Sequence, residues 1–256
     1  MTALITGASA GIGREFCRLL ASEGHDLVLV SRNVDRLNET KQEIQTLFPN
    51  IACEVFPADL SVADDLERVA QRLSSPDQPV DVLINNAGLG LNQHFVTGDV
   101  TREHYMIDVL VSAVMRLTHA AVGAMKNRGR GDVVIVSSVA SFIAGGTYSA
   151  AKAWNTVFAE GLAQELRGSG VKISALCPGF THTEFHQRAG IDKNEVPRWM
   201  WLDASAMVRA GWRDHQRGKV VSVPSWQYKM LTFIIAIAPR PFVRRVGYST
   251  RNRSRK

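Results

Sequence analysis

The sequence predicts an α/β fold, with a single doubly wound parallel sheet covered by helices on both faces. Short apolar runs alternate along the chain with amphipathic segments of about 12 to 25 residues, an order typical of parallel sheets. The apolar runs lack a regular polar alternation, as expected of strands buried on both sides. A chain of 256 residues with 45% hydrophobic and 21% charged residues can bury a core of this size.

Seven apolar runs are expected to form the strands. They are Leu4–Thr6, Asp26–Ser31, Ala52–Phe56, Val82–Asn85, Asp132–Ser137, Lys172–Cys177 and Val220–Val223. Between them, Val34–Leu47 and Val62–Leu73 show helical periodicity. Right-handed crossovers place the carboxyl ends of the strands on one edge, where a ligand binds. We expect one domain over residues 1–223 and a basic C-terminal extension over residues 224–256.

A glycine turn follows the first predicted strand. The run Leu4–Thr6 breaks into Gly7-Ala-Ser-Ala-Gly11-Ile-Gly13 and continues with helical periodicity. Glycines allow a tight turn and a close approach to a ligand, and the amides at a helix N-terminus attract a pyrophosphate. The turn therefore predicts a dinucleotide site, because an ordinary strand–helix turn needs only one glycine.

Tyr148 and Lys152 are four residues apart and project from one face of a predicted helix. A nearby ammonium favours the phenolate and lowers the pKa of the phenol. Lowering this pKa by about 2–3 units requires roughly 3–4 kcal/mol of differential interaction. We expect an acidified phenol that exchanges protons; the alternative is a solvated helix face.

Three further motifs follow the glycine turn in order: Asn85-Asn-Ala-Gly88, Ser138 and Pro178-Gly179. In this combination, over roughly residues 2–222, the sequence resembles the short-chain dehydrogenase/reductase (SDR) family. The resemblance implies a Rossmann-type fold, a nicotinamide dinucleotide, and hydride transfer to or from a carbonyl or alcohol carbon (EC 1.1.1.-). Met106–Met125 and Tyr148–Leu166 resemble the helices through which the family forms dimers, which implies a homodimer or homotetramer.

The resemblance assigns three catalytic residues. Ser138 would hydrogen-bond the substrate oxygen, Tyr148 would exchange the proton, and Lys152 would lower the pKa of Tyr148 and hold the nicotinamide ribose. The remaining matched positions would contact the cofactor. They are Gly7, Ser9, Gly11, Ile12 and Gly13 at the phosphates, Asp59 and Leu60 at the adenine, Asn86, Ala87 and Gly88 at the ribose, and Pro178, Gly179 and Thr183 at the nicotinamide. The alternative for Asp59 is a cap for the helical segment that begins at Ser61.

Ser31 and Arg32 at the end of the second predicted strand favour NADP(H). An acidic residue there would bind a ribose 2′-hydroxyl and repel a 2′-phosphate, whereas a guanidinium binds phosphate well. If Arg32 is only a surface arginine, NAD(H) is used as well.

The chain departs from the family pattern in two places. The interval from Ser138 to Tyr148 is shorter than usual and contains Gly145-Gly146. Leu110 stands where the family has an asparagine that orders a proton-relay water, so either Asp108 or Ser112 substitutes for it or the enzyme is slow. Leu110 keeps open a second interpretation, a non-catalytic dinucleotide-binding sensor or scaffold recruited through its basic tail.

Residues from about 184 to 210 match the position of the family's substrate lid. Phe185, Trp199, Met200 and Trp201 give this segment a large apolar area, which favours a lipid-like or cyclic hydrophobic substrate. The alternative is that these side chains only pack the segment onto the body of the domain.

Positive charge is concentrated near the C-terminus. Residues 213–256 contain eleven Lys and Arg and one acidic residue, so the rest of the chain is mildly acidic although the total is +6. The apolar run Met230–Ala238 is too short to span a bilayer, which requires about 20 residues. A helix lying on an anionic membrane surface and a subunit contact both fit, whereas nucleic acid is disfavoured because no base-reading motif is present.

Cys17, Cys53 and Cys177 fall in predicted helical or strand segments. We expect buried free thiols and a reducing, cytoplasmic compartment. No Cys/His spacing indicates a metal site, and no signal peptide precedes the first predicted strand.

Overall fold

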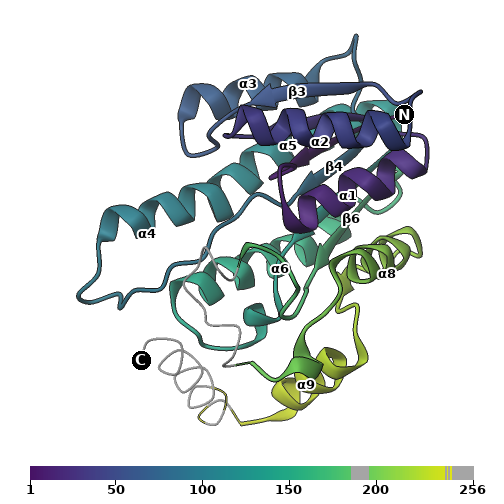
Figure 1. Cartoon of the computed structure of the whole chain (residues 1–256). Coiled ribbons are helices and arrows are strands. Elements are labelled where there is room, and N and C mark those ends of the chain that lie inside the picture. The colour runs from purple at the N-terminus through teal and green to yellow at the C-terminus, as the bar shows by residue number, and fades with distance from the viewer. Residues whose placement is uncertain (186–195, 240, 242, 244–256) are drawn as a thin grey trace.

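A computed structural model describes residues 1–185, 196–239, 241 and 243. Within them, seven parallel strands form one sheet in the order β3-β2-β1-β4-β5-β6-β7 (Figure 1), which confirms the predicted Rossmann-type fold. The strands are β1 (Thr2–Thr6), β2 (Asp26–Ser31), β3 (Cys53–Pro57), β4 (Val82–Asn85), β5 (Gly131–Val136), β6 (Val171–Leu176) and β7 (Val221–Ser222).

The predicted boundaries agree with the observed ones to within two residues. β2 and β4 begin and end as expected, and so does the helix α2 (Val34–Leu47). Cys177 was expected inside a strand but follows β6 directly, where its amide still donates to Ser222 O at 2.7 Å. The pattern of apolar residues therefore predicts which segments form strands and helices more accurately than it predicts where each one begins and ends.

Helices cover both faces of the sheet because alternate strand residues point to opposite sides. In β1, Leu4 packs with α3 (Ala63–Ser74), α5 (Ala113–Arg128) and α6 (Thr147–Glu165), while Ala3 and Ile5 pack on the opposite face. That face is covered by α1 (Gly11–Ser22), α2 and α8 (Ala204–Gln216). Two cores result, one on each side of the sheet.

A long helix runs from Val100 to Arg128 and consists of α4 (Val100–Ile107), a π-helical segment η1 (Asp108–Ser112) and α5. It is long and apolar enough to cross a membrane, but more than half of its most apolar stretch is buried inside the fold. Core helices of globular domains share these properties, so we assign it to the core. It ends at Gly129, whose φ of 68° provides the left-handed C-cap.

The C-terminal helix α9 (Trp226–Ile237) is attached to the core by Tyr228. The Tyr228 ring is 2% exposed, and its hydroxyl accepts from Phe180 N at 3.0 Å and donates to Met200 O at 2.9 Å. Met200 lies in the short 3-10 helix η4 (Arg198–Met200). The first turn of the predicted extension therefore packs against the domain that precedes it.

Candidate active site

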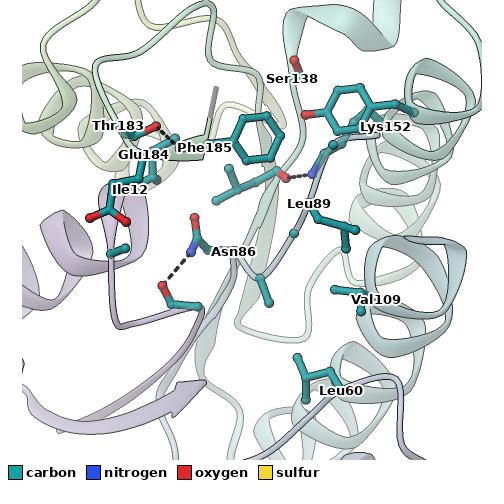
Figure 2. Close-up of a pocket in the computed structure, with 18 of the residues that line it drawn as sticks. Ile12, Leu60, Asn86, Leu89, Val109, Ser138, Lys152, Thr183, Glu184 and Phe185 are labelled. Atoms are coloured by element: carbon teal, nitrogen blue, oxygen red, sulfur yellow. Dashed lines mark hydrogen bonds between the residues drawn. The ribbon is translucent and has the colours of Figure 1, made fainter. Parts of the chain in front are cut away.

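A cavity of about 690 Å³ lies at the carboxyl edge of the sheet (Figure 2). Every residue assigned from the sequence to catalysis or to the cofactor lines it, with the exception of Gly13. Those residues are Gly7, Ser9, Gly11, Ile12, Arg32, Asp59, Leu60, Asn86, Ala87, Gly88, Ser138, Tyr148, Lys152, Pro178, Gly179 and Thr183. Segments from the whole length of the domain thus meet at one place.

The glycine turn has the geometry of an anion site. Gly7 and Gly11 have φ values of 68° and 52°, which non-glycine residues rarely adopt. Ala10, the N-cap residue of α1, makes no side-chain cap, and the first turn of α1 contains no acidic residue. The amides at this helix N-terminus are therefore available to an anionic ligand.

Gly13 was expected at the phosphates but is buried beneath the turn. A Cβ at Gly13 would lie 2.2 Å from Gly7 O, so only glycine lets α1 pack this closely. Gly13 therefore shapes the turn from beneath.

Asn86 connects β4 to the glycine turn. Its Nδ2 donates to Thr6 O at 2.9 Å and to Gly7 O at 3.3 Å, as Figure 2 shows in part. Thr6 Oγ1 in turn accepts from the amides of Asn86 and Ala87, each at 2.9 Å. These bonds hold the ends of the two central strands together.

Ser138, Tyr148 and Lys152 converge at the far end of the cavity. Ser138 follows β5, and its Oγ accepts from Ala140 N at 3.1 Å. The Ser138 hydroxyl also lies close enough to the Tyr148 phenol to influence its pKa. Gly146, with a φ of 92°, allows α6 to start after a short loop. The shortened interval between Ser138 and Tyr148 therefore still brings the two hydroxyls together.

The pKa of Tyr148 differs from the sequence-based expectation. Burial raises the pKa of Tyr148 to about 12, while the nearby Ser138 hydroxyl acts in the opposite direction. Lys152 Nζ donates to Val136 O at 2.7 Å and lies 5.9 Å from the centre of the Tyr148 ring. Burial also lowers the pKa of Lys152, to about 8. The pKa of the phenol is thus raised and not lowered as expected, because desolvation is the largest influence on it.

Arg32 belongs to a cluster that the sequence did not predict. Arg32 donates to the Tyr105 hydroxyl from α4, with its guanidinium 5.8 Å from the centre of the Tyr105 ring. It also lies 3.7 Å from Asp59 Oδ2. Asp59 Oδ1 accepts from the Ser61 amide at 3.0 Å and from the Ser61 hydroxyl at 2.7 Å. Asp59 thus stabilises the turn before α3 and also lines the cavity. It is not the cap that the alternative expectation named, because α3 begins at Ala63 with Val62 as its N-cap residue.

Leu110 lies in η1 and is fully buried. Its Cδ2 is 2.9 Å from the position that a Cβ on Gly88 would occupy, and the same position is 3.9 Å from Lys152 Nζ. Asp108 and Ser112 do not line the cavity. Neither residue therefore lies where we expect a substitute for the asparagine that the family has at position 110. Leu110 fills the space beside Lys152 with an apolar side chain.

Glu103 is a buried carboxylate that sequence reasoning missed. It is 4% exposed, and its oxygens accept from Thr147 Oγ1 at 2.6 Å and from Gln93 Nε2 at 2.9 Å. Thr147 directly precedes Tyr148, so Glu103 connects α4 and the loop around Gln93 to the start of α6. A single glutamate in an amphipathic helix is not part of any local sequence pattern that predicts long-range hydrogen bonds such as these.

The aromatic residues of the predicted lid have different environments. Phe185 lines the cavity, its ring centre 6.1 Å from that of Tyr148. Trp201 instead packs on Phe180 and His182, with ring centres 5.6 and 5.0 Å away. Trp199 is 63% exposed. Residues 186–195 of the predicted lid lie outside the described residues.

The apolar wall of the cavity is formed mainly by residues that precede the predicted lid. Leu89 and Val109 line it opposite Phe185 (Figure 2), and Leu91 also lines it. Among the residues that the structure describes, no group of three or more His, Cys, Asp or Glu side chains is placed to hold a metal ion.

The sequence model of the short chain dehydrogenase family matches residues 1–194. An uncharacterized oxidoreductase of Myxococcus xanthus (strain DK1622) is 31% identical over 245 residues, which cover 94% of this chain and 93% of the relative. The ketoacyl reductase HetN of Nostoc sp. (strain PCC 7120) is 33% identical over 182 residues, or 70% of this chain and 63% of HetN. The chain thus belongs to the short-chain dehydrogenase/reductase family.

Two solved structures share the fold. A short-chain dehydrogenase from Sphingobium yanoikuyae in complex with NADPH has a TM-score of 0.83 and 32% identity, covering 93% of this chain and 96% of that one. The bulky-bulky ketone specific alcohol dehydrogenase from Comamonas testosteroni has a TM-score of 0.79 and 28% identity, covering 93% and 95%. Together with the family match, they identify the protein as an NAD(P)-dependent oxidoreductase of the EC 1.1.1.- class.

Proposed function

We propose that the protein is an NADP(H)-dependent carbonyl reductase or alcohol dehydrogenase for bulky hydrophobic substrates. The observation that supports this most directly is that one cavity contains the glycine turn, Arg32 and the Ser138, Tyr148 and Lys152 group. A dinucleotide held by the glycine turn and Arg32 would share this cavity with the phenol of Tyr148.

The residues present fit a nicotinamide dinucleotide. The uncapped N-terminus of α1 and the left-handed glycines Gly7 and Gly11 suit a pyrophosphate, and Asn86 to Gly88 suit the adjacent ribose. Lys152 would donate to the hydroxyls of the nicotinamide ribose. When bound, the nicotinamide supplies or accepts the hydride.

In the reducing direction, Ser138 donates a hydrogen bond to the carbonyl oxygen and Tyr148 gives it a proton as negative charge develops. With the pKa of Tyr148 raised to about 12, the phenol is protonated at neutral pH, as a proton donor must be. With the pKa of Lys152 at about 8, its ammonium is mostly charged at pH 7 and stabilises the phenolate that forms.

The preference for NADP(H) rests on Arg32. Its side chain is 66% exposed and lines the cavity, with Tyr105 holding the guanidinium from one side. A guanidinium in this position favours the 2′-phosphate of NADP(H). The Sphingobium yanoikuyae relative was solved with NADPH. Use of NAD(H) at lower affinity is compatible with the same site.

The hydrophobic substrate class rests on the apolar wall near Tyr148. Phe185, Leu89 and Leu91 surround the position that a substrate would occupy beside the phenol, and apolar walls with a few polar groups favour bulky apolar ligands. The names of two relatives, a ketoacyl reductase and a bulky-bulky ketone specific alcohol dehydrogenase, agree with a carbonyl substrate.

Turnover of a panel of bulky ketones with NADPH tests the proposal, with Tyr148→Phe as the matched variant. We expect activity in the parent protein and a loss of about 10²- to 10⁴-fold in the variant, since the proton donor is removed. NADPH binding, followed by its fluorescence, should remain. Binding of NADPH by a parent protein that reduces no ketone would instead favour a non-catalytic sensor or scaffold.

We further propose that residues 1–223 form the catalytic domain and that the protein is a homo-oligomer. Met115 on α5 and Val157 on α6 are 51% and 65% exposed, which supports a subunit contact through these two helices. Light scattering on the parent and on Val157→Arg would test this, and an unchanged mass would exclude α6 from the contact.

A further inference from the structure

The outward face of α9 is apolar along its whole length. Six large apolar side chains of this helix are between 37% and 69% exposed: Trp226, Met230, Leu231, Phe233, Ile234 and Ile237. Positions 226, 230, 233, 234 and 237 recur every three or four residues and therefore form one stripe. Tyr228 lies on the opposite side of the helix and fixes this orientation, because its ring is buried in the core.

A surface helix of a globular protein normally turns polar residues outward. In α9 the only charged residue is Lys229, which is exposed. Figure 1 shows α9 at the periphery of the molecule, beyond α6 and α8. Trp199 is also exposed, and its backbone oxygen accepts from Gln227 Nε2 at 3.3 Å, so it lies next to α9. A contiguous apolar patch of this kind indicates an interaction site.

The charge of the sequence identifies the partner. Residues 226–256 contain eight Lys and Arg and no acidic residue. A second copy of the chain that paired its α9 with this one would bring two such segments together, and like charges would repel each other. An anionic lipid surface provides both an apolar interior for the stripe and negative headgroups for the basic residues.

We propose that α9 is a membrane-surface helix that lies in the interface of an anionic bilayer. With 12 residues it is about 18 Å long at 1.5 Å per residue, too short to cross the hydrocarbon core of roughly 30 Å. The helix inserts its apolar stripe between the headgroups while Tyr228 keeps it attached to the catalytic domain. Aromatic residues such as Trp226 and Trp199 suit the headgroup region.

Sedimentation of the full chain with phosphatidylcholine vesicles, with and without phosphatidylglycerol, tests the proposal. We expect binding to the anionic vesicles, weaker by about tenfold or more without phosphatidylglycerol. Binding should also fall in about 1 M salt, where charges are screened beyond roughly 3 Å. Trp226 fluorescence should shift to the blue on binding, as judged by comparison with Trp226→Phe.

The variant Phe233→Ser/Ile237→Ser removes apolar surface without touching the core, because both residues are 66–69% exposed. We expect it to fold as the parent does and to bind anionic vesicles at least about tenfold more weakly. Phe95→Ser is the matched control, since Phe95 is 58% exposed in a loop far from α9 in the sequence. It should bind as the parent does.

Three outcomes would overturn the proposal: no pelleting of the parent, equal pelleting with both kinds of vesicle, or equal weakening by Phe95→Ser. A loss of oligomeric mass in the double variant without vesicle binding by the parent would assign the stripe to a second copy. None of these outcomes depends on ketone turnover, so the proposed activity is tested separately.

Discussion

Replacing Gly179 by alanine is expected to destabilise the fold strongly although only one methyl group is added. A Cβ at Gly179 would lie 2.0 Å from Cε2 of Tyr228, 2.1 Å from Cζ and 2.4 Å from Cδ2. The φ of Gly179 lies outside the left-handed region, so the contact and not backbone strain determines the effect. The Tyr228 ring is buried and cannot rotate away without losing its packing.

The size of this destabilisation follows from the packing and the hydrogen bonds that Tyr228 would lose. Overpacking of a core costs about 1–3 kcal/mol. Displacing the hydroxyl weakens its bonds to Phe180 N and Met200 O, each contributing about 0.5–1.5 kcal/mol. We therefore expect the free energy of unfolding to fall by about 2–6 kcal/mol, as measured by urea unfolding followed by circular dichroism.

Two further variants make this prediction specific. Gly161→Ala in α6 is the control, because a Cβ there has no neighbour within 4 Å, and it should stabilise the helix by about 0.5–1 kcal/mol. In a Tyr228→Ala background the ring is absent, so Gly179→Ala should cost far less than in the parent. An equal cost in both backgrounds would refute the reasoning.

Three other predictions concern the cavity. The pKa of Lys152 is lowered to about 8 from an ordinary 10.5, so the unfolded chain binds an additional proton between these pH values. The free energy of unfolding that this group contributes should therefore rise with pH over that window. Urea unfolding at several pH values should show this rise in the parent protein and not in Lys152→Met. Tyr105→Phe removes the hydroxyl that holds Arg32. The affinity for 2′,5′-ADP, measured by calorimetry, should therefore fall by about 3- to 10-fold, which is within the range of about 0.5–1.5 kcal/mol for a typical hydrogen bond, while the affinity for 5′-AMP should not change. Thr147→Val leaves the buried Glu103 short of one donor and should cost about 1–3 kcal/mol of stability; an unchanged urea midpoint would show that the bond contributes nothing.

The parts of this protein that the sequence predicts are those encoded locally. Strands buried on both faces read as apolar runs, and α2 was expected with its observed limits because its periodicity is regular. The glycine turn and the pair Tyr148 and Lys152 are also short-range patterns. Their positions in one cavity follow from the parallel topology, which places the ends of all strands on one edge.

The parts that the sequence does not predict depend on contacts between distant segments. Arg32 and Tyr105 are 73 residues apart, and Glu103 and Thr147 are 44 apart. The pKa of Tyr148 was predicted in the wrong direction for the same reason, since burial by the surrounding elements determines it and the four-residue spacing to Lys152 does not reveal that burial.

Contacts between distant segments also hold the walls of the cavity in place. Asn86 joins the glycine turn to the end of β4, and Glu103 binds Thr147 at the start of α6. The ring of Tyr228 packs against Gly179. Each joins a separate wall of the cavity to an element on another part of the fold. The reacting groups come from short motifs, but their mutual distances are set by these bonds. Substitutions at the supporting positions should therefore alter the geometry of catalysis while leaving the motifs intact.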